Sequence, residues 1–168
     1  MAEVVYRALQ VVDLEQVHQV ALKAWHWTYQ HIFDDEFITQ FIDTHFAPQR
    51  LRQQLVQVEQ NQVFFEVATV ENQIVGFCNL GRTQHAARLF RIYLLPEHIG
   101  RGIGRTLLHR GEAWLRAQGI FEYGCYVHQG NTVGQQFYLR EGFQRQPEHD
   151  HDDEWYMQKK LADNPAEA

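Results

Sequence analysis

The stretch from Leu94 to Leu108 reads LLPEHIGRGIGRTLL. Its apolar start is typical of a strand that ends at Pro96, and glycines then occupy positions 100, 102 and 104. An amphipathic helix is expected to follow. The first turn of a helix has free backbone N–H groups at the positive end of its dipole, so a junction of this kind can bind an anion. The stretch therefore predicts a phosphate-binding loop.

Two common phosphate motifs do not fit the loop. The dinucleotide fingerprint Gly-x-Gly-x-x-Gly requires a third glycine, but Arg105 or Leu107 occupies that position in the two possible registers. The P-loop requires Gly-Lys-Ser/Thr, which the chain lacks. A binder of some other nucleotide phosphate and a tight junction without any ligand stay open as alternatives.

Hydrophobic periodicity around the loop predicts alternating strands and helices. Strands are expected over 4–9, 63–70, 74–80, 88–95, 121–128, 143–145 and 154–161, and helices over 14–31, from 48, over 104–118 and over 131–140. Asp13 is expected to cap the first helix, with Gln16 completing a capping box, and Asp34-Asp35-Glu36 to form an acidic loop. The order β-α-α-β-β-β-α-β-α-β-β predicts an α+β domain on a mixed sheet, over residues 1–161, with a disordered tail over 162–168.

Composition narrows the class of protein. The 168 residues carry a formal charge of −6 without a basic stripe, so nucleic acid is not an expected partner. The chain shows no signal-peptide pattern and no apolar run of membrane-spanning length, so no membrane partner is expected. Cys78 and Cys125 lie in strand-like runs and are expected to be buried thiols. These features predict a cytoplasmic protein.

Two segments resemble motifs of one known family. Residues 96–104 resemble motif A of the GNAT superfamily of N-acetyltransferases, Gln/Arg-x-x-Gly-x-Gly/Ala, with Gly102 and Gly104 at the last two glycine positions. Ile99 stands where Gln or Arg is usual, which removes a polar side chain but leaves the backbone donors. Residues 131–143 resemble motif B, Asn…Phe-Tyr…Gly-Phe, so the resemblance covers nearly the whole chain.

The resemblance implies a fold, an activity and a donor. It implies a single-domain GNAT-like fold with a mixed, mostly antiparallel sheet of about seven strands and flanking helices. It also implies acetyl-CoA as the co-substrate and direct attack by a primary amine of a small molecule or peptide in a ternary complex. A homodimer is an expected assembly. The alternative is a non-catalytic acyl-CoA-binding or regulatory module on the same fold.

The resemblance also places the CoA-binding residues. The main chain of Tyr93, Leu94 and Leu95 would bind the pantetheine arm, and the Leu94 N–H would donate to the thioester oxygen as it becomes an oxyanion. The pyrophosphate would lie on a loop made of Gly100, Arg101, Gly102, Ile103, Gly104, Arg105 and Thr106. Further CoA contacts are expected from Asn131, Phe137 and Tyr138.

Tyr138 is the expected general acid for the leaving thiolate. A tyrosine has an ordinary pKa of about 10 and a thiol about 8.5, so complete proton transfer is uphill by roughly 2 kcal/mol. A hydrogen bond in the transition state or a lowered pKa of Tyr138 would suffice. The alternative is a core aromatic side chain.

The general base is harder to assign. An aliphatic amine with a pKa of about 10.4 is neutral in roughly one molecule in a few thousand at pH 7, so its proton must be removed. Many family members have a Glu near the start of the strand before motif A, but residues 85–91 contain no acid. Glu66 is taken as the base, with His85, Glu122 and His128 as other candidates and plain structural roles as the alternative.

The acceptor side is expected near the first helix, where Trp25, Trp27 and Tyr29 occur. Asp34-Asp35-Glu36 and the negative charge of the chain favour a cationic acceptor such as a polyamine, with a solvated loop as the alternative. The run His149-Asp150-His151-Asp152-Asp153 carries ligand-type residues, but consecutive residues in a loop seldom form a preformed site. No metal is therefore expected.

Overall fold

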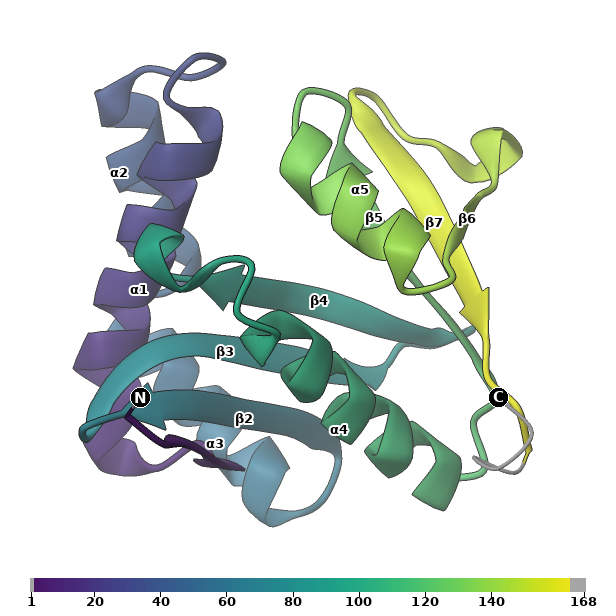
Figure 1. Cartoon of the computed structure of the whole chain (residues 1–168), viewed down its shortest axis with the longest axis horizontal. Coiled ribbons are helices and arrows are strands. Elements are labelled where there is room, and N and C mark those ends of the chain that lie inside the picture. Colours follow the sequence, from purple (N-terminus) through teal and green to yellow (C-terminus); the bar gives the residue numbers. More distant parts are fainter. Residues whose placement is uncertain (1, 164–168) are drawn as a thin grey trace.

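A computed structural model describes residues 2–163 of the chain (Figure 1). The predicted disordered tail falls largely on residues 164–168, which lie outside the described residues. Three short 3-10 turns occur at Val11–Asp13, Pro96–His98 and Pro147–His149. The longer elements are, in order, β1 (Val4–Ala8), α1 (Leu14–Tyr29), α2 (Asp35–His45), α3 (Pro48–Glu59), β2 (Val63–Val70), β3 (Gln73–Arg82), β4 (Ala87–Leu94), α4 (Ile103–Ala117), β5 (Glu122–His128), α5 (Thr132–Arg140), β6 (Gln144–Arg145) and β7 (Glu154–Lys160).

The strands form one seven-stranded sheet in the order β1-β2-β3-β4-β5-β7-β6. Every neighbouring pair is antiparallel except β4 and β5, which run parallel and pair at Arg88 and Gly124. Beyond that pair the two strands diverge, and Figure 1 shows β5, β6, β7 and α5 as a lobe set apart from β1–β4. The predicted α+β architecture with a mixed, mostly antiparallel sheet is confirmed, and its main feature is a split at the parallel pair.

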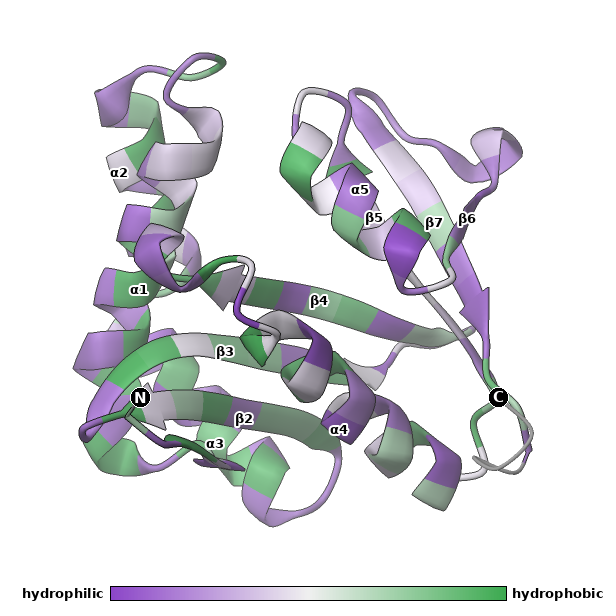
Figure 2. Ribbon diagram, viewed as in Figure 1, coloured by the Kyte–Doolittle hydropathy of each residue, from purple (hydrophilic) through white to green (hydrophobic). Residues whose placement is uncertain are grey.

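Two hydrophobic clusters lie on opposite faces of the sheet. One packs α4 and α5 against the sheet through residues such as Leu107, Leu108 and Tyr138. The other packs α1, α2 and α3 through residues such as Val17, Ile38 and Leu51. In Figure 2 hydrophobic residues are prominent on β3 and β4, whereas the region of β6 and β7 is largely hydrophilic. The split in the sheet therefore lies between one face covered by α4 and α5 and another face covered by α1, α2 and α3.

A β-bulge shapes the strand beside the split. Asn79 pairs with Arg91 but the next residue, Leu80, pairs with Leu89, so Phe90 is the extra residue on β4. Leu89 packs in the cluster of α4 and α5, while Tyr93 packs in the cluster of α1 to α3. The bulge thus sets which β4 side chains face each side of the split.

The structure has one helix more than the sequence pattern predicted. The segment expected as an acidic loop begins α2 instead, with Asp34 as its N-cap accepting a hydrogen bond from the Phe37 N–H at 2.8 Å. Acidic residues are favourable in the first turn because they face the positive end of the helix dipole. Ile38 and Ile42, four residues apart, are fully buried and hold the helix against α1. Three helices therefore separate β1 from β2.

Asp13 does not cap α1, contrary to expectation. It is buried, pairs with Arg7 at 2.6 Å between Nη1 and Oδ2, and accepts a hydrogen bond from the Gln10 N–H. Gln16 does not complete a capping box, because its Oε1 accepts a hydrogen bond from the Ile74 N–H at 3.0 Å. Both polar side chains serve tertiary contacts between α1 and the sheet, which local spacing cannot reveal.

Candidate functional site

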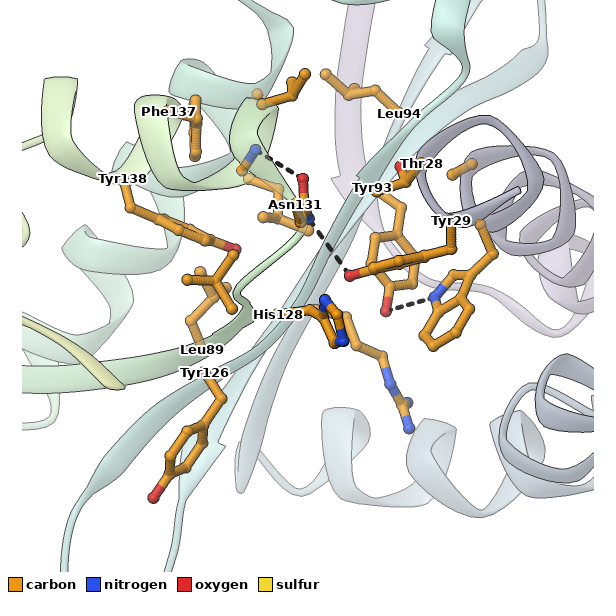
Figure 3. Close-up of a pocket in the computed structure, with 18 of the residues that line it drawn as sticks. Thr28, Tyr29, Leu89, Tyr93, Leu94, Tyr126, His128, Asn131, Phe137 and Tyr138 are labelled. Carbon is orange, nitrogen blue, oxygen red and sulfur yellow. Dashed lines mark hydrogen bonds between the residues drawn. The ribbon is translucent and has the colours of Figure 1, made fainter. Parts of the chain in front are cut away.

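A cleft of about 1000 Å³ opens where β4 and β5 diverge. Its walls come from α1, α2, β4, the glycine loop, β5, α5 and the segment before β7. Figure 3 shows side chains from α1, β4, β5 and α5 converging on this space. The cleft therefore passes through the split in the sheet and reaches both of its faces.

The glycine loop has the backbone geometry of an anion site. Gly100 and Gly102 adopt φ angles of +81° and +80°, which side-chain-bearing residues rarely adopt. α4 begins at Ile103, so the N–H groups of its first turn lie beside the cleft at the positive end of the helix. Thr106 is a correction to the expected set, because its N–H donates to the Gly102 carbonyl at 3.0 Å and starts the intrahelical pattern.

The two arginines of the loop have different surroundings. Arg101 is exposed, whereas Arg105 Nε donates to Glu141 Oε1 at 2.8 Å, and His109 lies 3.0 Å from the other oxygen of that carboxylate. Burial alone would raise the pKa of Glu141, but the hydrogen bonds and positive charges of Arg105 and His109 outweigh it and lower the pKa. The Glu141 carboxylate thus holds the Arg105 side chain in the cleft wall. Ile99 is also part of this wall.

The main chain of β4 presents alternate residues to the split. The Leu95 N–H donates to the Val75 carbonyl at 2.8 Å, and the Leu95 carbonyl accepts from the His98 N–H at 2.9 Å. Main-chain hydrogen-bonding groups alternate in direction along a strand. The main-chain N–H and C=O of Tyr93 therefore also face β3, and the Leu94 N–H faces the split. Leu94 is where the sequence placed it. The main-chain groups of Tyr93 and Leu95 are engaged elsewhere, and the residue that joins Leu94 at the split is Ile92.

The same argument applies to β5. The Gln129 N–H donates to Asp153 and the Leu161 N–H donates to Phe121, both at 2.7 Å, which fixes the pairing with β7. The main chain of Tyr126 therefore faces the split. Sequence reasoning missed Tyr126, because alternation along a strand separates two sets of main-chain groups without showing which set faces the split.

Tyr138 lies on α5 at the wall of the cleft, and its hydroxyl points from the helix into the pocket (Figure 3). Its ring packs against Phe143 with a centroid separation of 5.2 Å. Burial raises the pKa of Tyr138 well above its ordinary value, with a smaller contribution from the neighbouring thiol of Cys125. The hydroxyl therefore keeps its proton and is a hydrogen-bond donor rather than a strong acid.

Asn131 joins the two sides of the cleft. Its Oδ1 caps α5 by accepting from the Gly134 N–H at 2.9 Å, and its Nδ2 donates to Tyr29 Oη at 3.3 Å (Figure 3). Phe137 also lines the cleft, between α5 and the start of α4. The side chain of Asn131 is therefore committed to a structural bridge between α1 and α5.

Aromatic side chains of α1 and α2 form the opposite wall. Trp25 packs on Tyr29 at 4.4 Å and on Phe41 at 4.0 Å between ring centroids, and Trp25 Nε1 donates to Tyr93 Oη at 3.0 Å. Burial raises the pKa of Tyr29. The aromatic side chains that line this wall are Trp25, Trp27, Tyr29, Phe33, Phe37, Phe41 and Phe46.

The acidic residues at the cleft are not those that the sequence suggested. Asp34, Asp35 and Glu36 start α2 and are not part of the cleft wall within the described structure. The wall instead includes His151, Asp152, Asp153 and Glu154, which precede or begin β7. Negative charge therefore reaches the cleft from the segment that leads into β7 and not from the first helices.

Glu66, the predicted base, lies away from the cleft. It lies on the α4 face of β2, bound to Arg110 with 2.9 Å between Nη2 and Oε1, and it is absent from the cleft wall among the described residues. His85 lies in the turn before β4, and Glu122 pairs with Gln158 at 2.9 Å, so neither reaches the cleft wall. Only one of the four candidates that the sequence named, His128, lines the cleft.

His128 is poorly placed to accept a proton. Its Nδ1 accepts a hydrogen bond from the Gly130 N–H at 3.0 Å, which leaves the proton of the neutral ring on Nε2. Its ring lies 5.9 Å from that of Tyr29 and 5.6 Å from that of Phe33. The ring therefore packs against the aromatic wall at this end of the cleft, while its Nδ1 is occupied by the Gly130 N–H.

The remaining sequence candidates have structural roles. Cys78 and Cys125 are buried, as predicted, and burial raises the pKa of both thiols. In the loop before β7, Asp150 accepts hydrogen bonds from Arg145 and from the Tyr156 N–H. Within residues 2–163, no three His, Cys, Asp or Glu side chains gather as a metal ion would require. Across the same residues, every helix is too short or too polar for a membrane crossing.

Comparisons with known proteins concern the part of the chain that contains the glycine loop and α5. Residues 59–145 match the sequence profile of the Acetyltransferase (GNAT) domain, a range that contains both the glycine loop and α5. A spermidine N(1)-acetyltransferase of Thermoplasma acidophilum is 36% identical over 138 residues, which cover 82% of this chain and 86% of that protein.

Solved structures show the same architecture. The crystal structure of the PaiA N-acetyltransferase of Thermoplasma acidophilum in complex with coenzyme A has a TM-score of 0.90 and 32% identity, over 95% of this chain and 99% of that chain. An acetyltransferase of the GNAT family from Staphylococcus aureus Mu50 has a TM-score of 0.75 and 15% identity, over 95% and 100% of the two chains. The latter likeness concerns the fold alone.

Proposed function

The chain belongs to the GNAT family of acetyltransferases, and from this premise we propose that it acetylates a primary amine of a spermidine-like polyamine. Its family makes it an acetyl-CoA-dependent N-acetyltransferase, with acetyl-CoA as the co-substrate. The acceptor and the roles of individual residues are the parts that we propose.

We call the glycine loop, the start of α4 and the split between β4 and β5 the donor half of the cleft, and this half suits CoA. We assign the pyrophosphate to the N–H groups at the start of α4, beside Gly100 and Gly102, with Arg105 adding positive charge. The pantetheine arm would lie in the split and pair with the free main-chain groups of Ile92 and Leu94 on β4 and of Tyr126 on β5. This arrangement leads the thioester from the α4 face towards the aromatic wall.

The chemical step follows from the groups that face the split. The ammonium form of the acceptor first loses a proton to solvent. The neutral amine nitrogen then attacks the thioester carbon, and the carbonyl oxygen becomes an oxyanion that accepts a hydrogen bond from the Leu94 N–H. The C–S bond then breaks, and the thiolate of CoA accepts a hydrogen bond or proton from the Tyr138 hydroxyl, which points into the pocket. The nitrogen loses its second proton to solvent, and Tyr138 regains from solvent any proton that it gave to the thiolate. The products are the N-acetylamine and CoA.

The aromatic wall opposite the donor half supports a polyamine as the acceptor. Aromatic faces attract ammonium groups, and the α1–α2 wall presents several of them to the cleft. Acidic side chains before and at the start of β7 line the other side. The 36% identity to a spermidine N(1)-acetyltransferase supports the same class of acceptor.

The test is a comparison of acceptors with the purified enzyme. Acetyl-CoA consumption would be measured with spermidine, an aminoglycoside, a free amino acid and a peptide N-terminus. We expect kcat/KM for spermidine to exceed that of each other class by about tenfold or more. A preference for the amino acid or the peptide would contradict the proposal.

A further inference from the structure

The acceptor end of the cleft contains charges of both signs. Arg91 of β4 lines the cleft and stacks on Phe46, with its guanidinium carbon 4.3 Å from the ring centroid. Within the described residues no carboxylate pairs with Arg91, and its burial lowers the pKa of the guanidinium. An ammonium group is therefore repelled from the part of the cleft beside Arg91.

Glu154 lies on the other side of the same space. It is the first residue of β7 and the cross-strand neighbour of His128, whose ring faces Tyr29 and Phe33. Residues alternate between the two faces of a strand. Trp155 and Met157 pack in the cluster of α4 and α5, so Glu154 belongs to the opposite face, towards the aromatic wall.

Two observations connect this carboxylate with the cleft rather than with a partner in the fold. Glu154 is part of the cleft wall, and within residues 2–163 no cationic side chain pairs with it. Its negative charge contributes to raising the pKa of both Tyr29 and Tyr93, after the larger effect of burial, so its field reaches the hydroxyls on the far wall. The neighbouring Asp153 is different, because its Oδ1 accepts a hydrogen bond from Gln129 at 3.0 Å.

We propose that Glu154 binds the ammonium group of the acceptor that is not being acetylated, and so makes amines with two or more nitrogens better substrates than monoamines. The inference rests on the proposed polyamine acceptor and names the residue that selects it. Arg91 disfavours a second cation beside Phe46, so the extended chain of the polyamine lies with its free ammonium at Glu154. Glu154 is thus a specificity-determining residue rather than the base.

The experiment compares two acceptors in three proteins. Spermidine and butylamine, which has a single nitrogen, would be assayed at saturating acetyl-CoA with the wild type, Glu154→Gln and Glu148→Gln. Glu148 is the matched control because it is an exposed acid in the segment before β7 and lies outside the cleft wall. The dissociation constant of CoA, measured for each protein, reports whether the cleft is intact.

We expect Glu154→Gln to raise KM for spermidine by about tenfold, because the amide keeps a hydrogen-bond acceptor but loses the negative charge that pairs with the ammonium group. KM for butylamine, kcat for both amines and CoA binding should stay close to wild type, and Glu148→Gln should change none of them. Glu154→Asp should restore part of the affinity for spermidine.

Two results would overturn the inference. An unchanged KM for spermidine in Glu154→Gln would show that the carboxylate does not bind the acceptor, and equal losses for both amines would place its effect on the reacting nitrogen. If the wild type does not turn over spermidine at all, the proposed function itself fails, which is a different outcome from either of these.

Discussion

The donor half of the cleft is formed mainly by main-chain groups, whereas the acceptor half, at the aromatic wall, is formed by side chains. The donor half uses backbone groups: two glycines with positive φ, the first turn of α4 and the free edges of β4 and β5. The acceptor half uses side chains from α1, α2, β4, β5 and β7. A backbone site depends on the local conformation of one segment, whereas a side-chain site depends on how distant segments meet. Substitutions can therefore change which acceptor the side-chain site binds while the backbone site stays the same.

The strongest test of this contrast is Tyr138→Phe, which removes the one hydroxyl that α5 supplies to the reaction in our proposal. We expect kcat to fall by about 10²–10⁴ while CoA affinity is little changed. Tyr126→Phe is the control, because the Tyr126 hydroxyl points away from the centre of the pocket in Figure 3. Steady-state kinetics and CoA titration measure the two effects.

The pH profile adds a second readout for Tyr138. Burial raises the pKa of Tyr138, so the hydroxyl should stay protonated at neutral and mildly alkaline pH. The wild-type rate should therefore show no decline from Tyr138 ionisation below about pH 10. An unchanged kcat in Tyr138→Phe would remove Tyr138 from the mechanism.

Gly102→Val tests whether the donor half is a backbone site. A β-branched residue at φ +80° is strained, and its side chain would project into open space beside the N–H groups. We expect CoA to bind about 100-fold more weakly, a loss of about 2.8 kcal/mol by calorimetric titration.

Gly119→Val is the matched control for that variant. Gly119 follows the same helix at its other end, with φ +72° and open space around its Cβ position. It should lose similar stability, about 1–2 kcal/mol, without losing CoA affinity. Wild-type CoA binding by Gly102→Val would place the phosphates elsewhere.

Glu141→Gln tests the one ion network of the donor half. The carboxylate of Glu141 is only 6% exposed and binds Arg105 and His109, so its loss should lower the free energy of unfolding by about 2 kcal/mol at pH 7. Its folded-state pKa is lowered, so this stability is present above about pH 4.3 and is lost as pH falls through the folded pKa. Denaturation at several pH values should show the two proteins converging in acid. A constant difference would contradict the network.

The smallest expected effect is that of Glu66→Gln, which tests the correction to the predicted base. The Arg110 partner is 45% exposed, so the pair should contribute at most about 1 kcal/mol to the free energy of unfolding. Because Glu66 lies on the α4 face of β2, the pH dependence of kcat/KM should match that of the wild type. A shifted acidic limb would return Glu66 to the list of candidate bases.

Much of the fold could be predicted because its signals are local. The strand–glycine–helix junction, the cap at Asn131 and the hairpin before β4 each depend on a few neighbouring residues. The sequence pattern did not predict α2, because Asp34, Asp35 and Glu36 suit an acidic loop as well as a helix N-terminus. Its buried Ile38 and Ile42 would have separated the two interpretations.

The site was less predictable where it depends on pairing between distant strands. Which main-chain groups of β4 face the split follows from the register with β3 and its bulge at Phe90, and so Ile92 and Leu94 could not be separated from Tyr93 and Leu95 beforehand. Glu154 becomes a cleft residue only because β7 pairs with β5 beside the split. Sequence alone places neither contact.

The burial of both cysteines has a practical consequence for the turnover assays. Cys78 and Cys125 are the two thiols of the chain, and each is enclosed in the cluster of α4 and α5 with a raised pKa. Thiolates are the form that reacts with disulfide-type colour reagents, and these side chains supply almost none at neutral pH. Released CoA can therefore be counted continuously with such a reagent, without the native enzyme contributing to the signal or being inactivated by it.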